Sequence, residues 1–398
     1  MLFQMTIMKL IKLYIVLFLC ISVCGLMFSC SEKTDSVATI SFNPKAKKRS
    51  VFETGVIKDI KLIKLESDSC IIGKIDKILR NDSLLYILDR YIAKEVFIFT
   101  IEGKFVNKIS RQGHGKYEYI RLWDIFFDKG SNTLCLLSDY DQKIISFTPD
   151  GKKVLGESKL PQMFSFIVPI KEGYIGYMKN YVQNHSLPYN IWTMDKSFNL
   201  LDGFVRIAPQ LECQSQSEVR ALSAYKDVVY FKPEFDNNIY QIKDGEISKR
   251  YILHFGSKTV PDLSTIDRDV EMGLMLLSMN TVANIYNYIE TNKYLLMDFR
   301  MDDEYYMGIY NKHKRTSEIV KLGYYKDEYI FPFGCIKGMD QYAIYSVVDY
   351  DGVYKRWLGR SKYVNFEEKY PKQVKNLRKL FPHLKEDGNP FIAIYSLK

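Results

Sequence analysis

The sequence predicts an all-β fold, a six-bladed β-propeller with one helical insertion at about residues 261–290. Three observations support this prediction. The 30 tyrosines and 24 phenylalanines raise the aromatic content to 14%, and aromatic side chains favour strands. Short runs of alternating apolar residues follow one another, separated by glycine or aspartate turns. A hairpin pattern recurs every 47–48 residues, and this period divides the remaining chain into about six units.

The first 29 residues have the composition of a secretory signal peptide. Lys9 and Lys12 provide a short positive region, and Leu13–Leu19 begin an apolar run. The stretch Met27–Cys30 resembles a bacterial lipobox, although Phe28 stands where a small residue is more usual. The lipobox pattern implies that the Cys30 thiol receives diacylglycerol and that the new amino group is acylated. The alternatives are an uncleaved transmembrane helix and cleavage without lipid, and Met8 begins a more typical signal than Met1.

Charge and cysteine content narrow the classes of partner. Residues 30–50 read as a lipidated tether, and residues 51–398 as the propeller, which we expect to be monomeric. The net charge of +9 is spread thinly except in the cluster at 45–49. We expect no nucleic-acid partner for an exported protein, and a basic tether near anionic headgroups is the simpler account. Four cysteines remain in the propeller, without CxxC spacing: Cys70, Cys135, Cys213 and Cys335. We expect free buried thiols, with disulfides as the alternative, and no zinc site.

The repeat is clearest in a hairpin unit that runs from Leu84–Asp89 to Phe105–Ile109. Its turn, Phe99–Lys104, matches Phe147–Lys152 48 residues later. Weaker matches follow at 192–198, 239–246 and 307–312. A period of 40–50 residues with about four strands is typical of a propeller blade, because ring closure protects the sheet edges. Three aspartates, expected to cap turns, end strands that the repeat makes equivalent: Asp89, Asp139 and Asp195.

Two further elements complete the prediction. Apolar residues spaced by three and four within 261–290 predict an amphipathic helix. This helix either caps one end of the propeller or packs on a blade for stability alone. A second short helix is expected at 372–380, before Pro382. The strands expected at 57–65 and 391–397 would close the ring in one shared blade.

Several motifs together resemble a known family. The loop 109–119 is similar to the glycine-rich sequence I-G-R-Q-G-x-G-P-G-E-Y, and 75–105, 235–240 and 389–395 also match the family pattern. On these motifs the chain resembles the six-bladed β-propeller lipoproteins common in Bacteroidetes. The resemblance covers most of 56–398 and implies the fold and an envelope location, but no established reaction. The loop departs from the pattern by losing two glycines and a proline, at Ser110, Lys116 and Tyr117.

The same loop supplies the candidate ligand-binding residues. Its glycines can turn backbone N–H groups toward one point, its cations attract anions, and its aromatic side chains suit a sugar or carboxylate ligand. The alternative is a connection between blades that an ion pair between Arg111 and Glu118 holds together. The candidates are Arg111, Gln112, His114, Glu118, Tyr119 and Trp123.

No catalytic, metal-binding or cofactor-binding motif is evident. The sequence lacks HExxH, a nucleophile elbow and a calcium loop, and the acidic run 298–304 is expected in β-turns. The histidines stand singly, at His114, His185, His254, His313 and His383.

The predicted function is therefore a binding or scaffold lipoprotein of the cell envelope. We expect a lipid anchor in the outer membrane, on its periplasmic or cell-surface face, and a glycan, a peptide or an envelope protein at the propeller mouth. The alternative is a hydrolase or lyase with a metal or paired carboxylates at the central tunnel, and a weaker one is a subunit of an uptake assembly. Converging carboxylates or histidines at the axis would favour the enzyme, and an aromatic or basic rim would favour binding.

Overall fold

The computed structural model describes residues 37–46, 49–182, 187–215, 219–265, 270–302, 304–322, 336–348 and 388–398, with isolated positions between 368 and 382. Nearly all of them belong to one compact unit, Thr39–Lys398. The expected signal peptide, Cys30, Cys335 and most of the second expected helix lie outside the described residues, as do His185 and His383.

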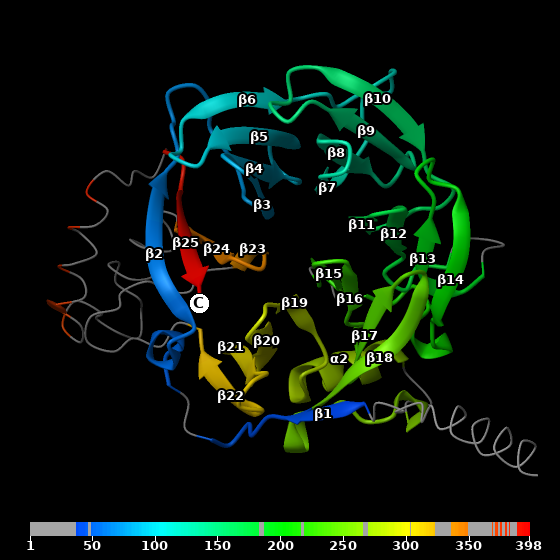
Figure 1. The fold of residues 1–398 in the computed structure, drawn as a ribbon, viewed down its shortest axis with the longest axis vertical. Helices are drawn as coiled ribbons and strands as arrows, with labels where there is room; N and C mark the ends of the chain where they lie inside the picture. Colours follow the sequence, from blue (N-terminus) through cyan, green and yellow to red (C-terminus); the bar gives the residue numbers. More distant parts are fainter. Residues whose placement is uncertain are drawn as a thin grey trace, which may run out of the picture. The chain divides into compact units, whose positions relative to one another are not determined.

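Six antiparallel sheets are arranged around a common axis, which confirms the six-bladed β-propeller (Figure 1). Blade 1 contains β3 (Lys77–Asn81), β4 (Leu84–Asp89), β5 (Glu95–Thr100) and β6 (Phe105–Ile109). Blade 2 contains β7 (Leu122–Asp128), β8 (Thr133–Ser138), β9 (Lys143–Phe147) and β10 (Val154–Lys159). Blade 3 contains β11 (Phe166–Ile170), β12 (Gly173–Tyr177), β13 (Tyr189–Met194) and β14 (Leu200–Arg206).

The other three blades have the same plan, with two additions. Blade 4 contains β15 (Leu222–Tyr225), β16 (Val228–Phe231), β17 (Asn238–Lys243) and β18 (Glu246–His254), and β1 (Ala38–Ser41) extends its outer edge. Blade 5 contains β19 (Ile285–Glu290), β20 (Tyr294–Met301), β21 (Glu304–Asn311) and β22 (Thr316–Lys321). Blade 6 contains β23 (Ile336–Met339), β24 (Ala343–Val348), β25 (Phe391–Leu397) and β2 (Ile57–Lys64).

The two ends of the chain close the ring, as the sequence predicts. Strand β2 pairs antiparallel with β25 from Ile57 opposite Leu397 to Lys64 opposite Phe391. Strand β25 also pairs with β24, so it lies inside blade 6. Burial follows from this ring. Most of the hydrophobic clusters combine residues of neighbouring blades, for example Tyr86 and Ile98 of blade 1 with Leu136 and Phe147 of blade 2.

The repeat seen in the sequence corresponds to the outer hairpin of blades 1 to 5. The matched turns join β5 to β6, β9 to β10, β13 to β14, β17 to β18 and β21 to β22. Asp195 lies in such an outer turn, where it accepts hydrogen bonds from the N–H groups of Ser197 and Asn199. Asp89 instead ends the second strand of blade 1, and Asp139 directly follows the second strand of blade 2. The expected equivalence of the three aspartates is therefore wrong for Asp195.

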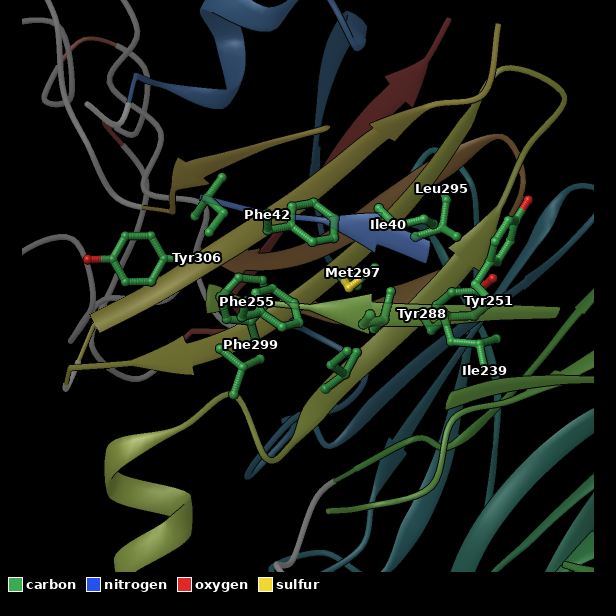
Figure 2. Close-up of a cluster of buried hydrophobic side chains, with 14 of the residues drawn as sticks. Ile40, Phe42, Ile239, Tyr251, Phe255, Tyr288, Leu295, Met297, Phe299 and Tyr306 are labelled. Carbon is green, nitrogen blue, oxygen red and sulfur yellow. The ribbon is translucent and has the colours of Figure 1, made fainter. Parts of the chain in front are cut away.

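The structure also corrects the boundaries of the tether and of the insertion. Residues 38–41, expected in the tether, form β1. Figure 2 shows how Ile40 and Phe42 enter a hydrophobic cluster between blades 4 and 5. Phe42 stacks on Phe255 with ring centroids 5.0 Å apart. This burial explains why so short a strand is held.

The insertion contains one described α-helix, α2 (Val270–Asn280), so the expected helical insertion is confirmed. Short 3-10 helices accompany the strands among the described residues: η1 (Val51–Thr54), η2 (Pro209–Leu211), η3 (Gly256–Lys258) and η4 (Leu263–Thr265). The expected insertion extended too far, because Ile285–Glu290 is the inner strand β19. Among the described helices, none is long and apolar enough to cross a bilayer.

Candidate functional site

The connections between strands divide the propeller into two unequal faces. Because the strands of each blade alternate in direction, turns within hairpins β3–β4 and β5–β6 reach one face, which we call the turn face. The second-to-third-strand loops and the connections between blades reach the other, which we call the loop face. Long connections of the described chain lie on the loop face, among them 65–76, 110–121, 207–221 and 255–284. A site built from loops is therefore expected there.

A group of cations surrounds one indole ring on the loop face. Trp123 lies near the start of β7, and three cationic groups lie over its ring: the guanidinium carbons of Arg90 and Arg121 at 4.5 and 5.1 Å, and Lys179 Nζ at 5.6 Å from the ring centroid. Arg90 follows β4 and Lys179 follows β12, so blades 1, 2 and 3 all contribute. We call Arg90, Arg121, Trp123 and Lys179 the cationic rim.

Backbone and side-chain hydrogen bonds to carboxylates hold the cationic rim in place. Arg121 makes a two-point ion pair with Asp139, at 2.8 Å for Nε and 2.6 Å for Nη2. These hydrogen bonds raise the pKa of Arg121. The backbone N–H of Arg90 donates to Asp76. Asp89, which is buried, accepts from the N–H groups of Gly73, Lys74 and Ile92. Asp89 therefore holds the loop before β3 and the loop after β4, which contains Arg90.

Two N–H donors of the cationic rim have no hydrogen-bond partner within the described part of the chain. They are Trp123 Nε1 and Arg90 Nε, and both atoms are buried. A buried donor without an acceptor is unfavourable by about 1–3 kcal/mol. Both atoms are covered in this structure, so a ligand oxygen could accept from either one only after neighbouring side chains move aside. The cationic rim thus combines positive charge with two donors that the described protein leaves unpaired.

Exposed tyrosines stand beside the cationic rim. The ring centroid of Tyr91 lies 5.6 Å from the Arg90 guanidinium, and that of Tyr140 lies 5.9 Å from the Arg121 guanidinium. Tyr91 and Tyr140 follow the second strands of blades 1 and 2 at the same offset. Tyr140 is 65% exposed, so the greater part of its side chain is free to pack against a ligand.

Toward the axis, charged groups are paired instead of exposed. Lys77 Nζ donates to both oxygens of Asp124, at 2.8 and 2.9 Å, and to the carbonyl of Ile125 at 2.7 Å. Burial lowers the pKa of Lys77, and the nearby Arg220 and Arg90 lower it further. This ion pair joins the inner strands of blades 1 and 2.

Arg220 connects four blades at the loop-face end of the inner strands. It precedes β15 of blade 4 and donates to the carbonyls of Lys337, at 2.6 Å, and Asp76, at 2.7 Å. Its third acceptor is Asn287 on β19 at 3.5 Å. Asp298, opposite Asn287 in β20, is buried, and its burial raises its pKa to about 6. The acidic run was expected in turns, which is wrong for Asp298.

The glycine-rich loop uses two of its candidate residues for its own structure. Glu118 Oε2 accepts from the N–H of Gly115 at 2.8 Å. It also fills the space beside Gly113, where a Cβ would lie 2.1 Å from Oε2. Tyr119 is buried, donates to the Lys94 carbonyl at 2.7 Å and accepts from the N–H of Arg111. Burial raises the pKa of Tyr119 to about 12. These contacts favour the structural alternative for Glu118 and Tyr119.

The other predicted residues divide between the loop and the cationic rim. Arg111, Gln112 and His114 are exposed on the loop, with the Arg111 guanidinium 6.0 Å from the ring centroid of Phe147. Trp123 is the one predicted candidate that belongs to the cationic rim. Sequence reasoning missed Arg90, Arg121 and Lys179. A usable signal was the recurrence of Arg90-Tyr91 and Asp139-Tyr140 directly after equivalent strands.

Metal-binding and thiol chemistry gain no support. Within the described residues, no three histidine, cysteine, aspartate or glutamate side chains converge in a way that could hold a metal ion. The described cysteines Cys70, Cys135 and Cys213 are free. Only Cys135 matches the expected buried thiol in a strand, because Cys70 is half-buried in a loop and Cys213 is exposed.

Comparison with known proteins identifies the family. A family profile described as "Domain of unknown function (DUF4934)" matches residues 38–396. The chain belongs to the DUF4934 family. No curated protein matches it. Membership in DUF4934 therefore carries no reaction with it.

Two solved structures resemble this DUF4934 member. One, from Bacteroides fragilis, is described as an exported protein; it is 19% identical, with 91% of this chain and 100% of that chain covered and a TM-score of 0.69. The other is a member of the DUF4221 family from Bacteroides vulgatus, 10% identical, with 86% of this chain and 97% of that chain covered and a TM-score of 0.53. At these identities the likeness extends to the fold alone.

Proposed function

We propose that this protein is an exported, lipid-anchored binding protein that holds an acidic glycan at the cationic rim of its propeller mouth. The observation that carries the proposal is the convergence of Arg90, Arg121 and Lys179 on Trp123, with two buried N–H donors left without an acceptor. Of the three partners that the sequence suggests, the glycan agrees best with this chemistry.

The charge and shape of the cationic rim argue for a ligand that is both anionic and flat-faced. Guanidinium and ammonium groups bind carboxylates and sulfates through charge-assisted hydrogen bonds. The exposed rings of Tyr91 and Tyr140 lie beside these cations, and aromatic rings pack against the apolar faces of sugars while polar groups fix the orientation. A uronic-acid oligosaccharide satisfies both demands.

Calorimetric titration of the protein with oligogalacturonate and with a neutral galactose oligomer tests this function. We expect the acidic oligomer to bind and the neutral one to bind at least about tenfold more weakly, because a charged hydrogen bond contributes about 1.5–3 kcal/mol. Raising the salt concentration should weaken binding, since exposed charges are screened.

Matched variants on the two faces sharpen the test. Lys179→Gln and Tyr140→Ala should weaken binding, whereas Lys171→Gln and Tyr342→Ala should not. Lys171 and Tyr342 are exposed residues of the turn face, and Tyr342 is as exposed as Tyr140, at 66% against 65%. Equal effects on both faces, or equal affinity for the neutral oligomer, would contradict the proposal. Preference for an acidic peptide would replace the glycan as the ligand.

The anchor is proposed from the lipobox at Cys30, and the exported location is proposed from the signal peptide. The resemblance to a protein described as exported supports the location. Mass spectrometry of the mature N-terminus should find acyl chains on Cys30. Cys30→Ser should release the protein from the membrane fraction, because several acyl chains hold a protein far more firmly than one.

The enzyme alternative has weaker support at the axis. The best carboxylate there, Asp124, is already neutralised by Lys77, and Asp298 faces Asn287 and the charge of Arg220. A hydrolase or lyase of the acidic glycan would release new sugar ends in the same titration mixture. Detection of such products would move the assignment from binding to catalysis.

A further inference from the structure

Helix α2 exposes a large apolar face on the loop face of the propeller. Its exposed side chains recur at helical spacing: Met272 is 48% exposed, Met275 43%, Leu276 49% and Met279 59%. Glu271 is the only charged residue among the eleven of the helix. A helix on a water-exposed surface normally carries charged residues on its outer side.

The opposite side of α2 is fixed to the protein, which sets the direction of the apolar face. Leu274 is buried in a cluster with Ile207, Leu211, Phe235, Val260 and Ala283. Thr281 donates its hydroxyl to the carbonyl of Leu277 at 2.7 Å and so closes the end of the helix. The four exposed side chains therefore point away from the propeller in the folded protein.

The N-terminal segment is attached beside the connection that carries α2. Ile40 and Phe42 are buried between blades 4 and 5, and Pro44 lies beside Gly256 at the start of η3, where an added Cβ would be 3.5 Å from Pro44 Cδ. The carbonyl of Lys258, in η3, accepts from the N–H of Val282, just after α2. Pro44 thus lies next to the same short helix that fixes the end of α2.

We propose that the apolar face of α2 rests on the bilayer that holds the lipid of Cys30. The inference rests on the lipid anchor proposed above. Ala38 follows Cys30 by eight positions, and an extended chain spans at most about 3.6 Å per position, or roughly 29 Å. A lipidated chain must hold blades 4 and 5 within this distance of the membrane. An apolar helix face of this kind lies about 5–10 Å deep in the headgroup and acyl boundary.

This arrangement leaves the cationic rim open. In Figure 1, α2 lies next to β18 and β19, whereas the strands that carry the rim, β4, β7 and β12, lie across the axis from it or to one side. A ring that touches the bilayer at α2 is tilted, and blades 1 and 2 are raised from the surface. The same loop face can then serve the membrane at one edge and a ligand at the other.

Tryptophan reporters in the lipidated full chain test the contact. The variants Met275→Trp and Met279→Trp are reconstituted into vesicles of phosphatidylethanolamine and phosphatidylglycerol that carry brominated acyl chains. Leu155→Trp and Tyr342→Trp are the controls, since both positions are exposed and lie outside α2. The three native tryptophans give a common background. We expect bromine to quench the α2 reporters about twofold more than the controls, given the insertion depth.

Hydrogen exchange of the unaltered lipidated protein provides a measurement that does not depend on the variants. Exchange across 270–280 should slow in vesicles relative to detergent, and exchange across 340–348 should not. Acylated Cys30 together with equal quenching at all four positions, or with unchanged exchange across 270–280, overturns the inference and leaves the anchor standing. Absence of acylation overturns both.

Discussion

The axis and the cationic rim of the mouth use similar side chains under opposite conditions. At the axis, Lys77 and Asp124 are removed from water and neutralise each other. At the rim, the side chain of Arg121 is 48% exposed although it forms an ion pair with Asp139. A buried charge contributes to holding blades together, whereas a half-exposed one stays available for a ligand. The difference separates the part of the mouth that maintains the ring from the part that can bind.

The largest effect should follow from breaking the axial pair. Asp124→Ala leaves the Lys77 ammonium buried without its partner, and the free energy of unfolding should fall by about 3–5 kcal/mol. Asp139→Ala at the rim should lower it by less than about 1 kcal/mol, because Arg121 can be hydrated. Urea unfolding measures both. The double variant Lys77→Met/Asp124→Leu should recover most of the loss, and equal losses for Asp124→Ala and Asp139→Ala would remove the distinction between axis and rim.

The pH dependence of stability reports on the axis through Asp298. Burial raises its pKa to about 6 from the ordinary 3.8, against the opposing influence of Asn287 and Arg220. The unfolded chain therefore releases this proton at lower pH than the folded protein does. The contribution of Asp298 to stability is greatest below about pH 4, falls as the pH rises to about 6, and is constant above.

Two pKa units correspond to a loss on the order of 3 kcal/mol. Asp298→Asn should abolish this part of the pH dependence and make the protein more stable than the wild type at pH 7. Thermal unfolding from pH 4 to pH 7 would show the effect. A variant that is less stable at pH 7 and keeps the wild-type slope would contradict it.

A smaller effect on stability, with a larger one on binding, is expected at Trp123. Trp123→Leu removes the ring on which the rim cations lie, and each such contact contributes about 0.5–1 kcal/mol at exposed sites. We expect a loss of stability of about 1–2 kcal/mol and a clear loss of affinity for oligogalacturonate. Trp192→Leu is the control, because Trp192 is buried in the cluster of blades 2 and 3. Trp192→Leu should lower stability and leave the affinity unchanged. If Trp192→Leu lowered the affinity and Trp123→Leu did not, the cationic rim would not be the binding site.

The smallest effects should occur on the glycine-rich loop. Glu118→Ala loses the hydrogen bond to Gly115 and should lower stability by about 1 kcal/mol. Arg111→Ala changes an exposed side chain and should cost less than about 0.5 kcal/mol. Neither should change the affinity for oligogalacturonate by as much as Trp123→Leu does. If Glu118→Ala abolished binding at unchanged melting temperature, the loop would belong to the site.

The fold could be predicted because its signals are local. Each outer hairpin carries its own alternation and its own turn, so Phe99–Lys104 and Phe147–Lys152 match in sequence without reference to any distant contact. The shared blade of 57–65 and 391–397 follows once a closed ring is assumed. The boundaries of the propeller could not be predicted as well as its repeat. Strand β1 depends on the burial of Ile40 and Phe42 against Phe255. The four residues of this strand contain no pattern that predicts the contact.

The candidate site could be predicted only in part because its members come from different blades. Arg90, Trp123 and Lys179 meet on one ring although up to 89 residues separate them. The composition of the glycine-rich loop favours a binding site, yet Glu118 and Tyr119 accept hydrogen bonds from backbone N–H groups of the loop itself. Arg90 and Tyr91 looked like ordinary loop residues. Only the curvature of the ring brings them beside Trp123.

The position of β25 has a consequence for how the protein is made. Strand β25 is the last of the described strands in sequence, and it lies between β2 and β24 in blade 6. Pairing Ile57 with Leu397 links positions 340 residues apart, and contacts between such distant positions form late. During synthesis β2 has no partner until residues 391–397 emerge. A chain cut before Phe391 would leave β2 and β24 with unpaired edges at once, and the ring would stay open.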